Sequence, residues 1–95
     1  MSNKQTSYYP VKNHIKEISL SQETIIDLVI SDSTIIYVFS HVDCRIAFNE
    51  STSIDNGVYV QAGVPQYFAV RKQYPKVVVK AVDEVGNIEV CECVI

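Results

Sequence analysis

The stretch KVVVKAVDEVGNIEVCECV, residues 76–94, decides the fold class of this chain. It begins with a valine-rich segment, its centre (DEVGN) carries the polar residues and glycine of a hairpin turn, and apolar residues return at 88–94. β-Branched side chains suit a pleated sheet and lose side-chain freedom in a helix, so the stretch predicts two strands joined by a hairpin. In the second strand, Ile88 and Val90 are expected on one face and Cys91 and Cys93 on the other. This predicts a bulge near Val90 or burial on both faces.

The preference for β structure extends over all 95 residues. Valine and isoleucine together number 26, whereas leucine and alanine, which lead the helix scale, together number six. A helix is the alternative for one segment, 23–30, but eight residues are short for a helix. The pattern predicts a single all-β domain, a jelly-roll-like sandwich of about eight short antiparallel strands. The expected strands lie within residues 15–20, 23–30, 34–40, 41–49, 58–61, 66–71, 76–82 and 88–94.

The first 13 residues lack this periodicity and are mostly polar around Tyr8 and Tyr9. We expect a polar N-terminal arm at residues 1–13, which is disordered or lies on a neighbouring molecule. The sandwich domain is expected at residues 14–95, and His14 at its start is expected to be solvated.

The sequence shows no targeting or membrane signal. No apolar leader follows Lys4, and the longest uncharged apolar stretch, residues 33–41, is too short to span a bilayer. We therefore expect a protein that has no membrane partner and is made and kept in the cytoplasm, unless it leaves by lysis or by a route without a leader.

The charge of the chain argues against nucleic-acid binding. Eight basic and eleven acidic residues give a net charge of −3, without the basic surplus of most nucleic-acid binders. A mixture of basic and aromatic residues can bind single strands, but lysines also protect the edge strand of a solvated hairpin. The acidic total favours the hairpin, so we expect no nucleic-acid partner. The one local cluster comprises Arg71, Lys72, Lys76 and Lys80, with Tyr67, Phe68 and Tyr74 among them.

The three cysteines, Cys44, Cys91 and Cys93, are predicted to be packed as reduced thiols, because an odd number without a leader argues against a disulfide framework. Cys91 and Cys93 point to one face of a strand, where His41 or Cys44 could join them as metal ligands. A second cysteine pair with the spacing of zinc sites is absent, so we predict no metal and no cofactor. Cys44 and His41 lie three residues apart on a strand and leave opposite faces, so they cannot form a nucleophile pair.

We predict no catalytic residue and expect that the protein is not an enzyme. The turn carboxylates at 83–84 are expected to face water, and no cleft is predicted between Glu89 and Glu92. The sequence also lacks a nucleophile elbow and a glycine-rich phosphate loop.

Three features predict that the chain assembles with copies of itself. Residues 34–40 (TIIYVFS) are apolar on both faces of the expected strand, the arm tyrosines have no partner within the arm, and a domain of 95 residues buries little surface alone. Burial of one Tyr or Ile side chain against a second subunit contributes about 1.5–3 kcal/mol. The predicted interface residues are Tyr8, Tyr9, Ile35, Tyr37 and Phe39.

From Ile35 onward, the segments IIYVFS, CRIAFN, NGVYVQAGVPQYFAVRK and KVVVKAVDEVGN follow one another. This order resembles small β-sandwich virion proteins of tailed bacteriophages, namely head-decoration, head-fibre and tail-associated subunits. The likeness covers about the last 60 residues and includes an aG-x-p-x-x-f-x-v stretch at Ala62–Val70. It implies a non-enzymatic, symmetric building block of the virion, often trimeric.

We therefore predict a structural subunit of a phage particle, made in the host cytoplasm and located in the virion, for example on the capsid. It would self-associate as a homo-oligomer and dock on other virion proteins through its arm. Deletion of residues 1–13 should abolish attachment while the sandwich stays folded. The alternative is a monomeric sandwich that binds carbohydrate on Tyr59, Tyr67 and Tyr74.

Overall fold

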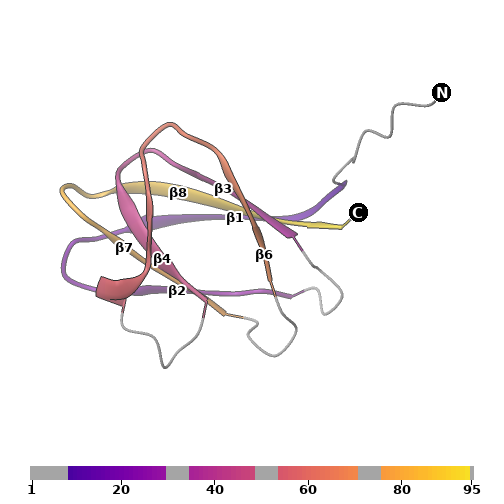
Figure 1. The fold of residues 1–95 in the computed structure, drawn as a ribbon, viewed down its shortest axis with the longest axis horizontal. Helices are drawn as coiled ribbons and strands as arrows, with labels where there is room; N and C mark the ends of the chain where they lie inside the picture. The colour runs from indigo at the N-terminus through magenta and orange to yellow at the C-terminus, as the bar shows by residue number, and fades with distance from the viewer. Residues whose placement is uncertain (1–8, 30–34, 49–53, 71–75, 95) are drawn as a thin grey trace.

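The computed structural model describes residues 9–29, 35–48, 54–70 and 76–94. They form two layers of strands that lie face to face (Figure 1). A short 3-10 helix, η1 (Ile54–Asn56), precedes the fifth strand. The strands are β1 (Tyr9–Ile18), β2 (Thr24–Asp27), β3 (Ile35–Ser40), β4 (Cys44–Ala47), β5 (Val58–Val60), β6 (Gln66–Ala69), β7 (Lys76–Ala81) and β8 (Gly86–Val94).

The strand order is that of a jelly roll. The first sheet has the order β1-β8-β3-β6 and the second sheet has the order β2-β7-β4-β5, and neighbouring strands are antiparallel. The strands therefore nest in pairs from the ends of the chain inward: β1 with β8, β2 with β7, β3 with β6 and β4 with β5. The prediction of an all-β, jelly-roll-like sandwich with about eight strands is confirmed.

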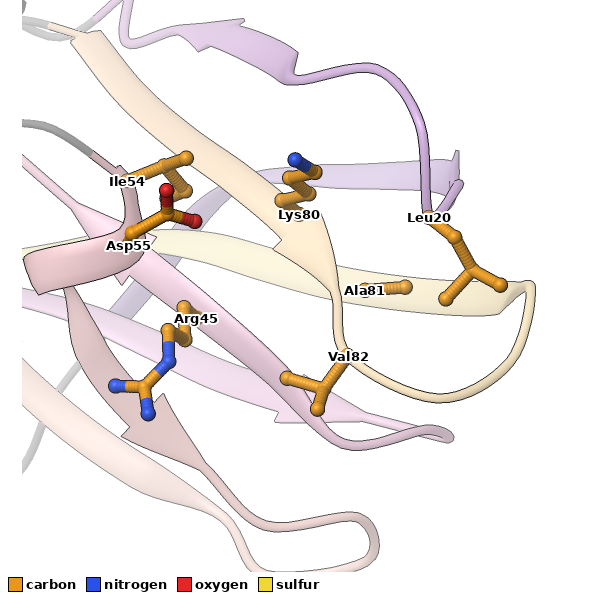
Figure 2. Close-up of a pocket in the computed structure, with 7 residues that line it drawn as sticks. All are labelled: Leu20, Arg45, Ile54, Asp55, Lys80, Ala81 and Val82. Carbon is orange, nitrogen blue, oxygen red and sulfur yellow. The ribbon is translucent and has the colours of Figure 1, made fainter.

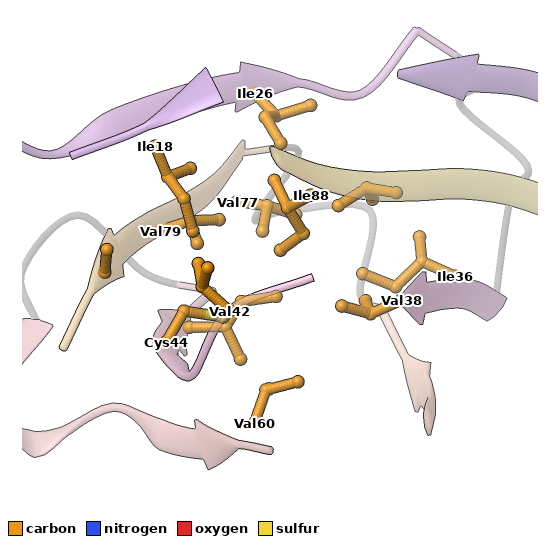
Figure 3. Close-up of a cluster of buried hydrophobic side chains, with 13 residues drawn as sticks. Ile18, Ile26, Ile36, Val38, Val42, Cys44, Val60, Val77, Val79 and Ile88 are labelled. Carbon is orange, nitrogen blue, oxygen red and sulfur yellow. The ribbon is translucent and has the colours of Figure 1, made fainter. Parts of the chain in front are cut away.

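The core between the two sheets consists almost entirely of valine and isoleucine (Figure 3). These side chains come from alternate positions of the strands, as in β3, where Ile36 and Val38 are fully buried. Stiff β-branched side chains fill a thin space between two pleated sheets without losing much rotamer freedom. The thirteen residues of the cluster are Ile18, Ile26, Ile36, Val38, Val42, Cys44, Ile46, Val60, Val77, Val79, Ala81, Ile88 and Val90.

The first strand is longer than expected and begins at Tyr9, so five residues of the predicted arm, 9–13, pair with β8. The sequence concealed this strand because its inward positions before Ile18 are the polar residues Lys12, His14 and Lys16. The backbone ladder to β8 holds β1 in place instead of an apolar face. Residues 1–8, which include the predicted interface residue Tyr8, lie outside the described residues.

The last strand is fully buried on its inner face and only partly buried on its outer face, where Glu89 and Cys91 are half-buried and Cys93 is buried, so burial on both faces is confirmed only in part. Ile88, Val90 and Glu92 point into the core, while Cys91 and Cys93 point outward. The register shift along this strand pair lies on β1, between Pro10 and Lys12, and not near Val90.

Within the described residues, no helix is long and apolar enough to cross a membrane.

Candidate functional site

The outer side of the first sheet carries an apolar surface that we call the thiol face. It is centred on β8 and β3, which have strand neighbours on both sides. Glu89 is its only charged residue. The face consists of three rows of Cα partners: Ile15–Glu89–Phe39, Asn13–Cys91–Tyr37–Tyr67 and Pro10–Cys93–Ile35–Ala69.

Three of the predicted interface residues lie side by side on this face. Ile35, Tyr37 and Phe39 occupy alternate positions of β3 and are half-buried. Tyr9 lies at the start of β1 with 62% of its surface exposed. The structure therefore brings Ile35, Tyr37 and Phe39 together, and their role in an interface stays a prediction.

A groove of about 420 Å³ crosses the middle of the thiol face. The rings of Tyr37 and Tyr67 flank it with their centroids 5.2 Å apart and their planes tilted by 60°. On its polar side, Asn13 Nδ2 donates a hydrogen bond to Glu89 Oε1 at 3.3 Å. The groove is lined by Pro10, Asn13, Tyr37, Tyr67, Glu89, Cys91 and Cys93.

The two thiols of the groove are close enough to interact with each other. Cys93 is 4% exposed and its Sγ donates to the carbonyl of Cys91 at 3.6 Å, while the half-buried Cys91 Sγ donates to the carbonyl of Glu92 at 3.8 Å. Burial raises the pKa of the Cys91 thiol, and the neighbouring Cys93 and Glu92 raise it further. Cys91 is therefore held as a protonated thiol at neutral pH.

Directly behind this face, β8 buries a carboxylate. Glu92 is fully buried, and its Oε2 lies 2.6 Å from Nε2 of His14 on β1. Both Glu92 oxygens also accept from the backbone N–H of Val29, at 3.0 Å each. Since a buried carboxylate is costly unless it is hydrogen-bonded, this network ties the edge strand β1 and the chain after β2 to β8. The expectation that His14 is solvated is wrong, because its side chain is only 10% exposed.

No protein-family model matches the chain, and no curated protein matches it in sequence. The fold is similar to a solved structure of Bacillus endospore appendages, described as a novel family of disulfide-linked pili. The TM-score is 0.55 with 14% sequence identity, over 98% of this chain and 92% of that chain. The likeness shows a shared fold. Because this neighbour is an appendage protein, the resemblance to phage virion proteins stays a prediction.

The outer side of the second sheet differs from the thiol face of the first sheet. A shallow pocket of about 240 Å³ lies there, and Figure 2 shows that Arg45 and Lys80 point to different sides of it. Arg45 Nη1 donates to the carbonyl of Gly57 at 3.0 Å, and its guanidinium lies 5.4 Å from the centroid of the Tyr59 ring. Arg45 is thus held by its own chain, and the two cations do not converge on one ligand position.

The predicted basic cluster is not assembled within the described residues. Lys76 and Lys80 lie on the outer side of β7 in the second sheet, whereas Tyr67 lies on the thiol face of the first. Phe68 packs against the core. Arg71, Lys72 and Tyr74 lie outside the described residues.

The side chains considered for catalysis or metal binding also lie apart. Cys44 is fully buried, whereas the His41 imidazole is exposed beside the Phe39 ring. Glu89 and Glu92 are on opposite faces of β8. Among the residues that the structure describes, no three His, Cys, Asp or Glu side chains gather as metal ligands.

Proposed function

We propose that this chain is a non-enzymatic structural subunit that assembles with copies of itself through the first sheet. The observation that carries this proposal is the thiol face, which extends over four strands with one charged residue in its three rows. The helix η1 packs against the second sheet, at β4 and β7. Exposed apolar surface of this kind is typical of a contact site.

The two edges of the first sheet suggest how copies meet. β1 and β6 are its outermost strands, so each has a side with no strand partner among the described residues. Ile15 on β1 is 63% exposed and Tyr67 on β6 is 53% exposed. An unpaired edge is a template for another strand. Pairing β1 of one copy with β6 of the next joins different surfaces head to tail, and it would bury the apolar side chains at the two rims of the thiol face, Ile15 and Tyr67, against the neighbouring copy. Repetition of that contact builds a ring or a filament.

The fold likeness to a pilus protein supports a structural role, but we propose that this assembly is not held by disulfides. The first 43 residues contain no cysteine. Cys44 and Cys93 are buried, and the half-buried Cys91 is recessed in the groove. A disulfide needs two Cβ atoms within about 4.5 Å, which such thiols do not reach across two folded copies. Assemblies are therefore expected to persist in a thiol reductant.

Charge substitution on each sheet tests the contact surface. Ile15→Lys places a cation on the edge of the first sheet, and Ile25→Lys is a matched control on the edge strand β2 of the second sheet, where Ile25 is 51% exposed. Light scattering and electron microscopy should show that Ile15→Lys abolishes assembly, while Ile25→Lys assembles like the wild type. A monomeric wild-type protein, or an Ile15→Lys protein that still assembles, would contradict the proposal.

A place in a tailed-phage particle, with synthesis in the host cytoplasm, is the finer part of the proposal. It is supported by the resemblance of residues 35–95 and by the likeness to another structural subunit. Docking through the arm is now best tested by deletion of residues 1–8, because residues 9–13 belong to β1. The truncated protein should stay folded by circular dichroism and lose attachment to the particle. Attachment at the wild-type level would contradict the role of the arm.

The groove favours carbohydrate as a second candidate ligand, since two tyrosine rings adjoin an amide and a carboxylate. Of the three tyrosines predicted for this role, Tyr67 lies on the first sheet and Tyr59 on the second, and Tyr74 lies outside the described residues. A monomer whose Tyr67 signals shift on titration with an oligosaccharide would favour this function. Glycan binding that is unchanged in Tyr67→Ala would remove it.

A further inference from the structure

The groove contains two thiols in a fixed relation. Cys91 and Cys93 stand two residues apart on β8, point to the same side and line the same groove. Both are reduced, and the two side chains interact. β8 is a central strand with β1 on one side and β3 on the other, so its backbone has little freedom to change their spacing.

This spacing prevents the two thiols from closing into a disulfide. Residues two apart on a strand are separated by about 6.6 Å, and their Cα–Cβ bonds are nearly parallel. A disulfide needs Cβ atoms about 3.5–4.5 Å apart, so it would require β8 to leave the sheet. The pair is thereby protected from its own oxidation as long as the strand keeps its neighbours.

The same spacing suits an ion between the sulfurs. Two metal–sulfur bonds of about 2.3 Å in a line span about 4.6 Å, a distance that two thiols on one strand reach by leaning toward each other. We propose that Cys91 and Cys93 form a two-coordinate thiolate site for a soft ion, and that its ligand is Cu(I).

The surroundings select for Cu(I) over Zn²⁺. Zinc in a structural site takes four ligands. Glu89 lines the same groove, but no three His, Cys, Asp or Glu side chains of the described residues gather closely enough to hold a metal ion. Soft thiolates favour Cu(I), for which two sulfurs can suffice. The rings of Tyr37 and Tyr67 and the ring of Pro10 line the groove beside the sulfurs and offer the ion no oxygen or nitrogen ligand from their ring faces.

Binding must displace the thiol protons. Thiols bind a metal ion as thiolates, so the ion competes with the proton of each thiol. A soft ion with strong sulfur affinity can do this, whereas a hard ion such as Mg²⁺ cannot.

The test is a titration of the full-length protein with Cu(I) under anaerobic, reducing conditions, against a chromogenic Cu(I) chelator as competitor. The wild type and Cys44→Ala are expected to take Cu(I) from the chelator, whereas Cys91→Ser and Cys93→Ser are expected to lose it. Cys44 is the matched control because it lies in the core, away from the groove. Circular dichroism verifies that each variant is folded.

X-ray absorption on the copper-loaded wild type provides a second readout that needs no variant. It should show two sulfur ligands and no nitrogen or oxygen ligand. Failure of the wild type to hold Cu(I), equal binding by Cys91→Ser, or a copper bound by other atoms would each overturn the proposal. The site does not depend on self-assembly, so a monomeric protein that binds Cu(I) would contradict the proposed function alone.

Discussion

The two sheets have one core in common but differ on their outer sides. On the second sheet, η1 places Ile54 over Ala47 and Val78, which together form a small separate cluster of buried residues. Arg45 is bound to the backbone of Gly57 and lies over the Tyr59 ring. On the thiol face of the first sheet, apolar rings and thiols line an open groove instead.

This difference concerns which outer side of the sandwich is covered by another element of the same chain. On the second sheet, η1 covers the central apolar positions Ala47 and Val78, while exposed apolar side chains such as Ile25 and Val58 lie on the outermost strands. Aromatic and aliphatic side chains on the first sheet gain hydrophobic stabilisation only when something else covers them. The difference is the physical basis for placing assembly on the first sheet.

The largest expected effect is the difference in unfolding free energy between variants on the two faces of β8. Glu92→Ala removes the partner of the His14 imidazole and of the Val29 N–H from a buried position, and should reduce the free energy of unfolding by about 3–5 kcal/mol. Glu89→Ala, on the outer face of the same strand, should change it by less than about 0.5 kcal/mol. Urea denaturation measures both. Equal losses in the two variants would contradict the assigned burial of Glu92.

A smaller effect compares the two outer sides directly. Ile54→Ala leaves a cavity over Ala47 and Val78 and should cost about 2 kcal/mol of stability. Ile15→Ala on the thiol face should cost less than about 0.5 kcal/mol and weaken assembly instead. Thermal unfolding and light scattering on both proteins give the two readouts. A larger loss of stability in Ile15→Ala than in Ile54→Ala would contradict the assignment of the uncovered outer side to the first sheet.

The smallest effect concerns a carboxylate beside the second sheet. Asp43 accepts from the Tyr59 hydroxyl at 2.5 Å and from the backbone N–H of Ala62 at 2.7 Å, and these hydrogen bonds lower its pKa below the usual 3.8. A depressed pKa means that the contribution to stability is present above pH 3.8 and is lost as the pH falls through the folded-state value.

In Tyr59→Phe, the pKa of Asp43 should rise toward 3.8 but stay below it, because the Ala62 N–H remains. An NMR titration of the Asp43 carboxyl carbon measures this shift. An unchanged midpoint would show that the Tyr59 hydroxyl does not hold the carboxylate in solution.

Much of the fold could be predicted from the sequence because its strands are short and rich in valine and isoleucine. The strand over 34–40 was expected to be apolar on both faces, and β3 has Ile36 and Val38 inside and Tyr37 outside. The start of β1 could not be predicted, because His14 occupies an inward position where an apolar residue was needed to reveal the alternation. The sequence did contain a signal for the buried network. Glu92 is the next inward position after Ile88 and Val90, and a charged residue there indicates a buried polar partner.

By itself, then, the sequence determined that this is a small β protein, where most of its strands lie and which residues alternate on them, since the two-residue period of a strand is a local property. Only the tertiary structure decided that β8 lies between β1 and β3. It thereby placed His14 against Glu92, 78 residues away, and Cys91 between Asn13 and Tyr37. The physical reason is that alternation fixes the face of a side chain but not its partner strand, which is chosen by long-range pairing and by the packing of both sheets at once.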